Sequence, residues 1–218
     1  MVIFDCNGVL VDSETITSAV LADAFNRVGI SLTADVVARQ FQGRRSADVF
    51  AAVEKATKRR LPSGFEIRVA TETLRRLRTE LRAIPHATHA LTWIRGPKAV
   101  ASSSGIDRVR TSLELTGLLR FFESRLFSAA EVPRGKPAPD LVLYAASRMQ
   151  VEPAACIVVE DSAAGVTAAA AAGMTPIGFV GGSRAGGQLA RALIAAGAYT
   201  VVADMRALKG AIIELRGW

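Results

Sequence analysis

The fold is decided by residues 1–12, which read MVIFDCNGVLVD. The apolar run Val2–Phe4 ends abruptly on the carboxylate of Asp5, and a glycine turn follows at Gly8. Such a run is typical of a buried strand in a parallel sheet, whose carboxyl end opens onto a loop. Ligands of open α/β sheets bind at that end, and a carboxylate held there is costly without a partner such as a metal ion. We therefore expect Asp5 to belong to a binding site.

A block of helices follows this strand. Residues 14–83 carry the apolar period of helices and no strand signal. Four helices are expected, near residues 14–28, 33–41, 46–59 and 65–82, with Ser13, Thr33 and Ser46 as N-caps of the first three. The chain is expected to cross between this block and the rest near Ser13-Glu14 and Ile84-Pro85, so these two crossings are the predicted hinge.

Short apolar runs alternate with helical stretches in the rest of the chain, and this alternation predicts a doubly wound parallel sheet. Six strands are expected, at residues 2–4, 98–101, 126–128, 156–159, 175–180 and 199–202. Helices are expected at residues 87–94, 106–117, 140–150, 163–172 and 187–196. The predicted fold class is α/β, with a core domain of residues 1–13 and 84–218 and an inserted all-helical cap domain of residues 14–83.

The composition predicts no nucleic-acid partner. The 218 residues carry a net charge of +7, but the basic residues are scattered, and the densest groups, 58–60 and 75–78, fall in amphipathic helices. Aromatic side chains are few and are not interleaved with the basic ones. No secretion signal, membrane span or other contact with a membrane is expected. The two cysteines, Cys6 and Cys156, form no metal or disulfide pattern, so we expect a cytoplasmic protein. We expect it to be a monomer or a homodimer.

Polar side chains stand at four of the expected strand ends: Asp5 with Asn7, Ser102, Lys136 in the loop after residue 128, and Glu160-Asp161. Parallel strands bring these ends to one edge of the sheet. Carboxylates suit a hard cation with oxygen ligands, above all Mg²⁺, which bridges protein and phosphate groups. Lysine and serine suit phosphoryl oxygens. The set predicts a site in which Asp5 attacks a phosphoryl group in line and forms an aspartyl-phosphate.

Each of these signals alone also has an ordinary structural interpretation. Ser102–Ser104 is a typical helix N-cap, and Glu160–Ser162 can place acids at a helix start. Lys136 before Pro137 is common in loops, and Asp12 is expected to have a structural role. The order of all four signals, each at a strand end, favours the site over these separate interpretations.

Four motifs follow one another as in a known superfamily. They are DCNGVLVDSE at 5–14, AVASSS at 99–104, GKPAPD at 135–140 and VVEDSAAG at 158–165. Together they resemble the haloacid dehalogenase superfamily, and the resemblance covers essentially the whole chain. The helical insert after the first motif makes the chain similar to the branch of beta-phosphoglucomutases and small sugar phosphatases.

The resemblance implies a role for each matching residue in phosphoryl transfer. Asp5 is the expected nucleophile, and Lys136 orients both this nucleophile and the phosphate. Ser102 and the backbone N–H groups near Ser103 are expected to bind the transferring phosphoryl group, while Gly8 lets the backbone turn closely around it. The implied partner is a small phosphorylated metabolite.

The resemblance also implies the ligands of a Mg²⁺ cofactor. These are a carboxylate oxygen of Asp5, the backbone carbonyl of Asn7 and a carboxylate oxygen of Asp161, with Glu160 acting directly or through water. Arg44-Arg45 in the expected cap falls where members of this branch reach down to the substrate. A solvated turn is the competing interpretation of these two arginines.

Asn7 departs from the pattern of the family's phosphatases. These have Asp at that position, which protonates the leaving group and then activates water, and such groups contribute roughly 10²–10⁴ in rate. Asn can do neither, so three interpretations stay open. The protein is a phosphatase with impaired turnover, a relative that cleaves carbon–phosphorus or carbon–halogen bonds, or a binding protein without turnover.

The retained acids and Lys136 favour the first interpretation. Carbon–phosphorus-cleaving relatives need a cap lysine, for which Lys55 or Lys58 could serve, but both are predicted to be surface residues. Dehalogenase relatives do not need the metal-binding acids that this chain retains. Phosphoglucomutase-like phosphoryl transfer is a further alternative, which nothing in the sequence demonstrates.

Overall fold

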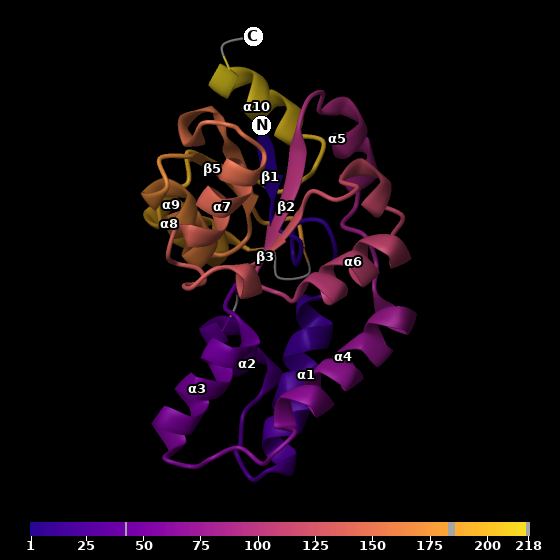
Figure 1. The fold of residues 1–218 in the computed structure, drawn as a ribbon, viewed down its shortest axis with the longest axis vertical. Coiled ribbons are helices and arrows are strands. Elements are labelled where there is room, and N and C mark those ends of the chain that lie inside the picture. Colours follow the sequence, from indigo (N-terminus) through magenta and orange to yellow (C-terminus); the bar gives the residue numbers. More distant parts are fainter. Residues whose placement is uncertain (42, 183–185, 217–218) are drawn as a thin grey trace.

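The computed structural model describes residues 1–41, 43–182 and 186–216 as an α/β fold with an open six-stranded sheet (Figure 1). The strands are β1 (Val2–Phe4), β2 (Lys98–Ser102), β3 (Leu126–Ser128), β4 (Ile157–Glu160), β5 (Thr175–Phe179) and β6 (Thr200–Val202). They lie in the order β3-β2-β1-β4-β5-β6, and every neighbouring pair is parallel. The predicted fold class and the six predicted strands are confirmed.

Helices account for most of the remaining described residues. They are α1 (Glu14–Arg27), α2 (Ala34–Phe41), α3 (Ser46–Thr57), α4 (Phe65–Glu80), α5 (Ala87–Trp93), α6 (Ile106–Leu115), α7 (Asp140–Arg148), α8 (Ala163–Ala171), α9 (Gly187–Ala195) and α10 (Leu208–Arg216). Helices α1 to α9 correspond to predicted ones. No helix in the described ranges is long and apolar enough to cross a bilayer.

Helix α10 has no counterpart among the predicted elements. Its buried residues Leu208, Ala211 and Ile212 recur at helical spacing, but Gly210 interrupts the run and lowers its helix propensity. The helix packs against α5 and β6, and such tertiary packing supplies most of the stability of a short helix. The local sequence therefore carries only part of the signal for it.

Both faces of the sheet are buried, as a parallel sheet requires. Because side chains alternate along a strand, Val2 and Phe4 join one apolar cluster, which also contains residues of α5, α6 and α10. Ile3 points to the opposite face and joins a second cluster with residues of α7 and α8. Figure 1 shows these helices on the two sides of the sheet. The central position of β1 between β2 and β4 therefore places Asp5, the next residue, in the middle of the fold.

Helices α1 to α4, residues 14–80, form what we call the four-helix segment, which lies beyond the carboxyl ends of the strands (Figure 1). It has an apolar cluster of its own, centred on Phe25, Phe50 and Phe65, whose ring centroids lie 5.3–6.2 Å apart. Leu77, near the end of α4, instead joins the apolar cluster of the sheet that contains Val2 and Phe4. The segment is thus internally packed yet anchored to the sheet layer at its base.

The two chain crossings between the sheet layer and the four-helix segment lie side by side. The Asp12 N–H donates to the Arg82 carbonyl oxygen, and the Ile84 N–H donates to the Leu10 carbonyl oxygen, each at 2.9 Å. An antiparallel bridge joins Val11 to Ala83 between them. The predicted crossings at 13–14 and 84–85 thus come together at one short backbone junction.

The structure modifies the predicted start and end of α3 and the predicted capping of α1. Arg45, rather than Ser46, is the N-cap of α3, and Ser46 is the first helical residue. This helix also ends at Thr57, short of the predicted Arg59, because Lys58 adopts the left-handed conformation with φ of 54°. Ser13 is the N-cap of α1 as predicted, but its hydroxyl makes no cap hydrogen bond with the helix.

Candidate active site

The candidate site lies where the direction of strand succession reverses. Strand β1 pairs with β2 on one side and with β4 on the other, so a crevice opens at the carboxyl ends of these strands. Asp5 follows β1, Ser102 ends β2, and Glu160 ends β4. Lys136 reaches the same place from the loop after β3, where its side chain contacts both Asp5 and Glu160. The structure thus brings together the polar residues predicted at four strand ends.

Lys136 holds two buried carboxylates at once. Its Nζ lies 2.6 Å from Asp5 Oδ1 and 3.2 Å from both carboxylate oxygens of Glu160. Lys136 is 4% exposed, Asp5 6% and Glu160 0%. The Ser162 hydroxyl donates to Glu160 Oε1 at 2.6 Å. Because a buried charge is tolerated only when it is paired, these contacts fix the orientation of the Asp5 carboxylate.

Burial and the neighbouring charges together set the protonation of Lys136 and Glu160. Burial disfavours the charged ammonium of Lys136, but the Asp5 and Glu160 carboxylates outweigh burial and raise its pKa. Burial and the nearby Asp5 charge raise the pKa of Glu160 to about 7, although Lys136 and Ser162 act in the opposite direction. Glu160 therefore takes up a proton near neutral pH.

This raised pKa predicts a pH dependence of stability in the metal-free protein. The folded-state pKa of Glu160 lies above its ordinary value of 4.5, so protonation of Glu160 stabilises the fold. That contribution is complete below about pH 4.5 and is lost as the pH rises through about 7. We expect the wild type to lose unfolding free energy relative to Glu160→Gln over this range, on the order of a few kcal/mol. Urea unfolding in EDTA at several pH values measures the difference, and parallel profiles would contradict it.

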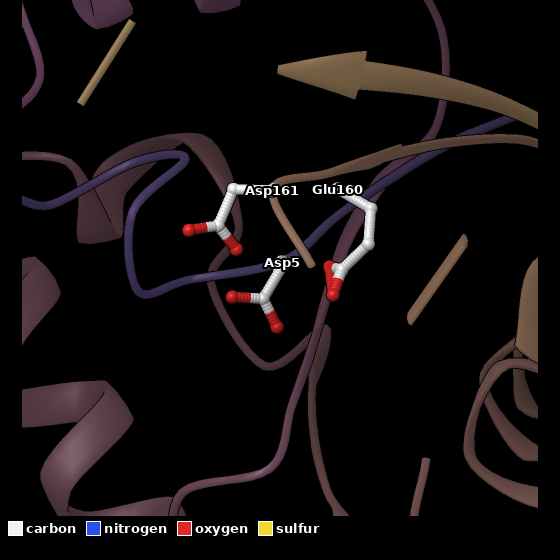
Figure 2. A group of neighbouring side chains, drawn as sticks. All are labelled: Asp5, Glu160 and Asp161. Atoms are coloured by element: carbon white, nitrogen blue, oxygen red, sulfur yellow. The ribbon is translucent and has the colours of Figure 1, made fainter. Parts of the chain in front are cut away.

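Three carboxylates gather beside this ion pair. Oxygens of Asp5, Glu160 and Asp161 lie within 4.8 Å of one another, and all three residues are buried. Figure 2 shows the Asp5 carboxylate between those of Asp161 and Glu160. Gly8 is packed so closely on Asp161 that an added Cβ would overlap its carboxylate, and its φ of 79° also favours glycine. Glycine at position 8 thereby leaves room for the Asp161 carboxylate.

This donor set fits Mg²⁺. The ion prefers hard oxygen ligands at about 2.0–2.1 Å, so oxygens on opposite sides of it lie about 4.2 Å apart, close to the spread of this cluster. Asp5 and Asp161 are the better candidates for direct ligands. Glu160 is already engaged by Lys136 and Ser162, which favours a supporting position for its carboxylate.

Asn7 is held by hydrogen bonds on both ends of its amide. Its Nδ2 donates to Ser104 Oγ at 3.0 Å and to Ser102 Oγ at 3.4 Å, and its Oδ1 accepts from the Ser13 hydroxyl at 2.8 Å. Asn7 also lines the cavity that contains Asp5 and Asp161. The side chain is therefore fixed in the same cavity as Asp5, the predicted nucleophile.

The three consecutive serines have different partners. Ser102 Oγ accepts hydrogen bonds from Asn7 and from the Ser104 N–H at 3.2 Å, so its own proton remains to be donated. The Ser103 hydroxyl donates to the Gly43 carbonyl oxygen at 2.6 Å and ties the four-helix segment to the sheet layer. The helix-cap interpretation of these serines is wrong, because Gly105 is the N-cap of α6 and no side chain caps that helix. Ser162, by contrast, does cap α8 by accepting from the Gly165 N–H.

A cavity of about 60 Å³ opens over Asp5, Asn7 and Asp161. Its other wall is formed by the four-helix segment, including Gly43 and Arg44. Arg45 does not line this cavity, because Asp48 binds its guanidinium at 2.8 and 3.1 Å. The structure thus separates the two arginines that the sequence could not distinguish.

Arg108, which was not predicted, also lines this cavity. It lies on α6, and its Nη2 donates to Thr17 Oγ1 on α1 at 2.6 Å. Burial lowers the pKa of Arg108, while the Glu14 carboxylate acts in the opposite direction. The sequence signal for Arg108 is weak. Only its neighbours Val109 and Ser112, which the structure shows to be buried, distinguish it from an arginine on a solvated helix face.

Comparisons with known proteins agree with this geometry. A model of the haloacid dehalogenase-like hydrolase family matches residues 1–173. The chain is 34% identical over 176 residues to 6-phosphogluconate phosphatase of Escherichia coli K12, covering 79% of each chain.

Two solved structures are similar over nearly the whole chain. One is a haloacid dehalogenase-like protein of unknown function from Agrobacterium tumefaciens, with a TM-score of 0.84, 32% identity, and 99% and 98% of the two chains covered. The other is a hydrolase of the same family from Deinococcus radiodurans with bound phosphate and sodium, with a TM-score of 0.75, 31% identity, and 98% and 94% covered. The chain therefore belongs to the haloacid dehalogenase-like hydrolase family.

Proposed function

We propose that the protein is a Mg²⁺-dependent phosphatase that acts on a small phosphorylated metabolite, a sugar phosphate or an organic-acid phosphate. The observation that carries this proposal is that Asp5, which is paired with the buried Lys136, lines one cavity together with Asp161. The name of the Escherichia coli relative and the phosphate bound in the Deinococcus radiodurans structure also support it.

In the proposed reaction, a carboxylate oxygen of Asp5 attacks the phosphorus atom in line. The phosphorus–oxygen bond to the leaving group breaks, and an aspartyl-phosphate forms. Lys136 holds the attacking carboxylate in place through Oδ1, and the Ser102 hydroxyl donates to a phosphoryl oxygen. The backbone N–H groups near Ser103 and the close backbone turn at Gly8 complete the phosphate site.

Asp5, Asp161 and the Asn7 backbone carbonyl would hold the Mg²⁺ ion, with Glu160 supporting it. When bound, the ion supplies positive charge beside the transferring phosphoryl group. Asn7 offers no proton to the leaving group and takes none from water. Turnover of the aspartyl-phosphate is therefore expected to be slow.

We also propose that residues 1–13 and 84–218 act as the catalytic core and residues 14–83 as a cap. Supporting this division, the four-helix segment supplies the far wall of the cavity, including Arg44. A cap in this position excludes water during transfer and selects the leaving group.

The test is to detect phosphorylated protein directly. Incubation with acetyl phosphate and Mg²⁺ is expected to add the mass of one phosphoryl group to Asp5, and EDTA is expected to prevent it. Asp5→Asn, which keeps the shape of the side chain, is the matched control and should stay unmodified. Absence of the adduct from the wild type, together with no phosphate release from any ester, would overturn the proposal.

A substrate panel separates the proposal from its alternatives. Sugar phosphates, phosphonates and halo-acids are tested side by side, with and without Mg²⁺. Release of halide, or phosphonate cleavage, would favour the carbon–halogen or carbon–phosphorus chemistries. An isomerised sugar phosphate would indicate phosphoglucomutase-like transfer, and tight binding without any adduct would indicate a binding protein.

A further inference from the structure

Two cavities meet at Arg108. The cavity over Asp5 has a volume of about 60 Å³, and an adjoining cavity between α1, α3, α4 and α6 has a volume of about 490 Å³. Arg108, Thr17 and Ser104 are among the residues that line both. Arg108 thus lies at the passage from the phosphoryl site to the larger space.

The small cavity cannot hold a whole phosphate ester. Its volume accommodates a few water molecules, which is comparable to a phosphoryl group and much less than a sugar phosphate. The rest of a bound ester must therefore extend from the phosphoryl site toward the larger cavity. On this path, the leaving-group portion of the ester passes the guanidinium of Arg108.

Arg108 has a hydrogen-bond donor to spare at this place. Its Nη2 is engaged by Thr17, whereas its Nε is buried and has no hydrogen-bond partner among the described residues. A buried donor without a partner is costly, and guanidinium donors form their strongest bonds with carboxylates and phosphates, often in pairs. The phosphoryl group itself is expected at Asp5 and Lys136, so the anion that suits Arg108 is a second one.

The remaining lining fits a hydroxylated acid. The hydroxyl of Ser104 lies in the same small cavity and can accept a hydrogen bond from a sugar hydroxyl. Leu21 and Phe50 add apolar surface in the larger cavity, which suits the C–H face of a carbon chain. Arg45 also lines the larger cavity, but Asp48 already neutralises it.

We propose that Arg108 is a specificity-determining residue that binds a carboxylate on the leaving-group portion of the substrate, so that the preferred substrates are phosphorylated sugar acids. This inference rests on the proposed phosphatase function and adds the class of leaving group. Arg108 binds the substrate and takes no part in bond breaking, so its loss changes which esters are preferred.

The experiment compares two esters of similar size. 6-Phosphogluconate carries a carboxylate opposite its phosphate, and glucose 6-phosphate does not. Isothermal titration calorimetry with Mg²⁺ is expected to show tighter binding of 6-phosphogluconate by the wild type. In Arg108→Ala the ratio of the two dissociation constants is expected to fall by roughly 10- to 100-fold. Because the ratio is taken within one protein sample, partial unfolding of the variant cancels.

Two further variants sharpen this test. Arg108→Lys keeps the charge but loses the planar fork, so part of the preference for the carboxylate should remain. Arg110→Ala removes an exposed arginine from the same helix and should leave the ratio unchanged.

The inference is overturned if the wild type shows no preference, or if Arg108→Ala keeps the ratio of the wild type. Phosphorylation of Asp5 by acetyl phosphate, measured in the same preparations, distinguishes the two levels of failure. An adduct with an unchanged ratio overturns the role of Arg108 alone. No adduct and no binding of either ester overturns the proposed function as well.

Discussion

Replacing Asn7 by Asp is expected to raise phosphate release from the best ester by roughly 10²–10⁴-fold. The new carboxyl group can protonate the leaving oxygen and later take a proton from the water that attacks the aspartyl-phosphate. Position 7 lines the cavity with Asp5, so the added group acts at the reacting atoms. Initial rates with Mg²⁺, together with the lifetime of the phosphorylated protein, measure the effect.

The surroundings of Asn7 can accept the change. The hydroxyls of Ser13, Ser102 and Ser104 are its hydrogen-bond partners, and those of Ser13 and Ser104 can donate to a carboxylate while the Ser102 proton stays available for the phosphoryl group. Asn7→Ala is the matched control, because it removes the same hydrogen bonds without adding a proton-transfer group, and it should give no gain. An Asn7→Asp protein as slow as the wild type would show that position 7 does not limit turnover.

Replacing Lys136 by Met is expected to cause the largest loss of stability. Removing one partner of a buried ion pair typically costs about 3–5 kcal/mol, because the other charge stays buried without compensation. Here Asp5 and Glu160 would both be left, 6% and 0% exposed. For a chain of this size, such a loss lowers Tm by roughly 6–20 °C. Phosphorylation of Asp5 should be lost as well, because its carboxylate is no longer oriented.

Thermal unfolding in EDTA measures this loss. Lys55→Met, which removes an exposed lysine from α3, is the control for the general effect of the substitution. Adding Glu160→Gln to Lys136→Met should recover little stability at neutral pH, because Glu160 takes up a proton there once Lys136 no longer lowers its pKa. A Tm for Lys136→Met within 2 °C of wild type, about the effect of 1 kcal/mol, would refute the buried-pair argument.

The sequence predicts those features of the fold and site that depend on short local patterns of residues. Short apolar runs ending on Asp5, Ser102 and Glu160 predict the strands. They also predict that these residues lie at one edge of the sheet, because parallel strands all have their carboxyl ends at the same edge. The sequence determines helix ends less well. Helix α10 was not predicted, because its stability comes from packing against α5 and β6.

The partners of individual arginine side chains could not be predicted. Arg44 and Arg45 are adjacent and chemically identical, and only the position of Asp48 one turn later decides which guanidinium is occupied. Arg108 resembles any arginine on a solvated helix until α1 brings Thr17 to its Nη2. The contact between Arg108 and Thr17 depends on the packing of the four-helix segment over the sheet, for which no local pattern exists.

The central position of β1 has a consequence for the order of events during synthesis on the ribosome. Val2 pairs with Lys98 on one side and with Ile157 on the other, so this strand has no partner until much of the chain has been made. At ~5–20 residues per second, roughly 8–30 s separate its appearance from that of β4. The apolar cluster of α1 to α4 can form in that interval. The nascent chain therefore carries an apolar strand with at least one unpaired edge, a site to which a chaperone can bind, until β4 emerges.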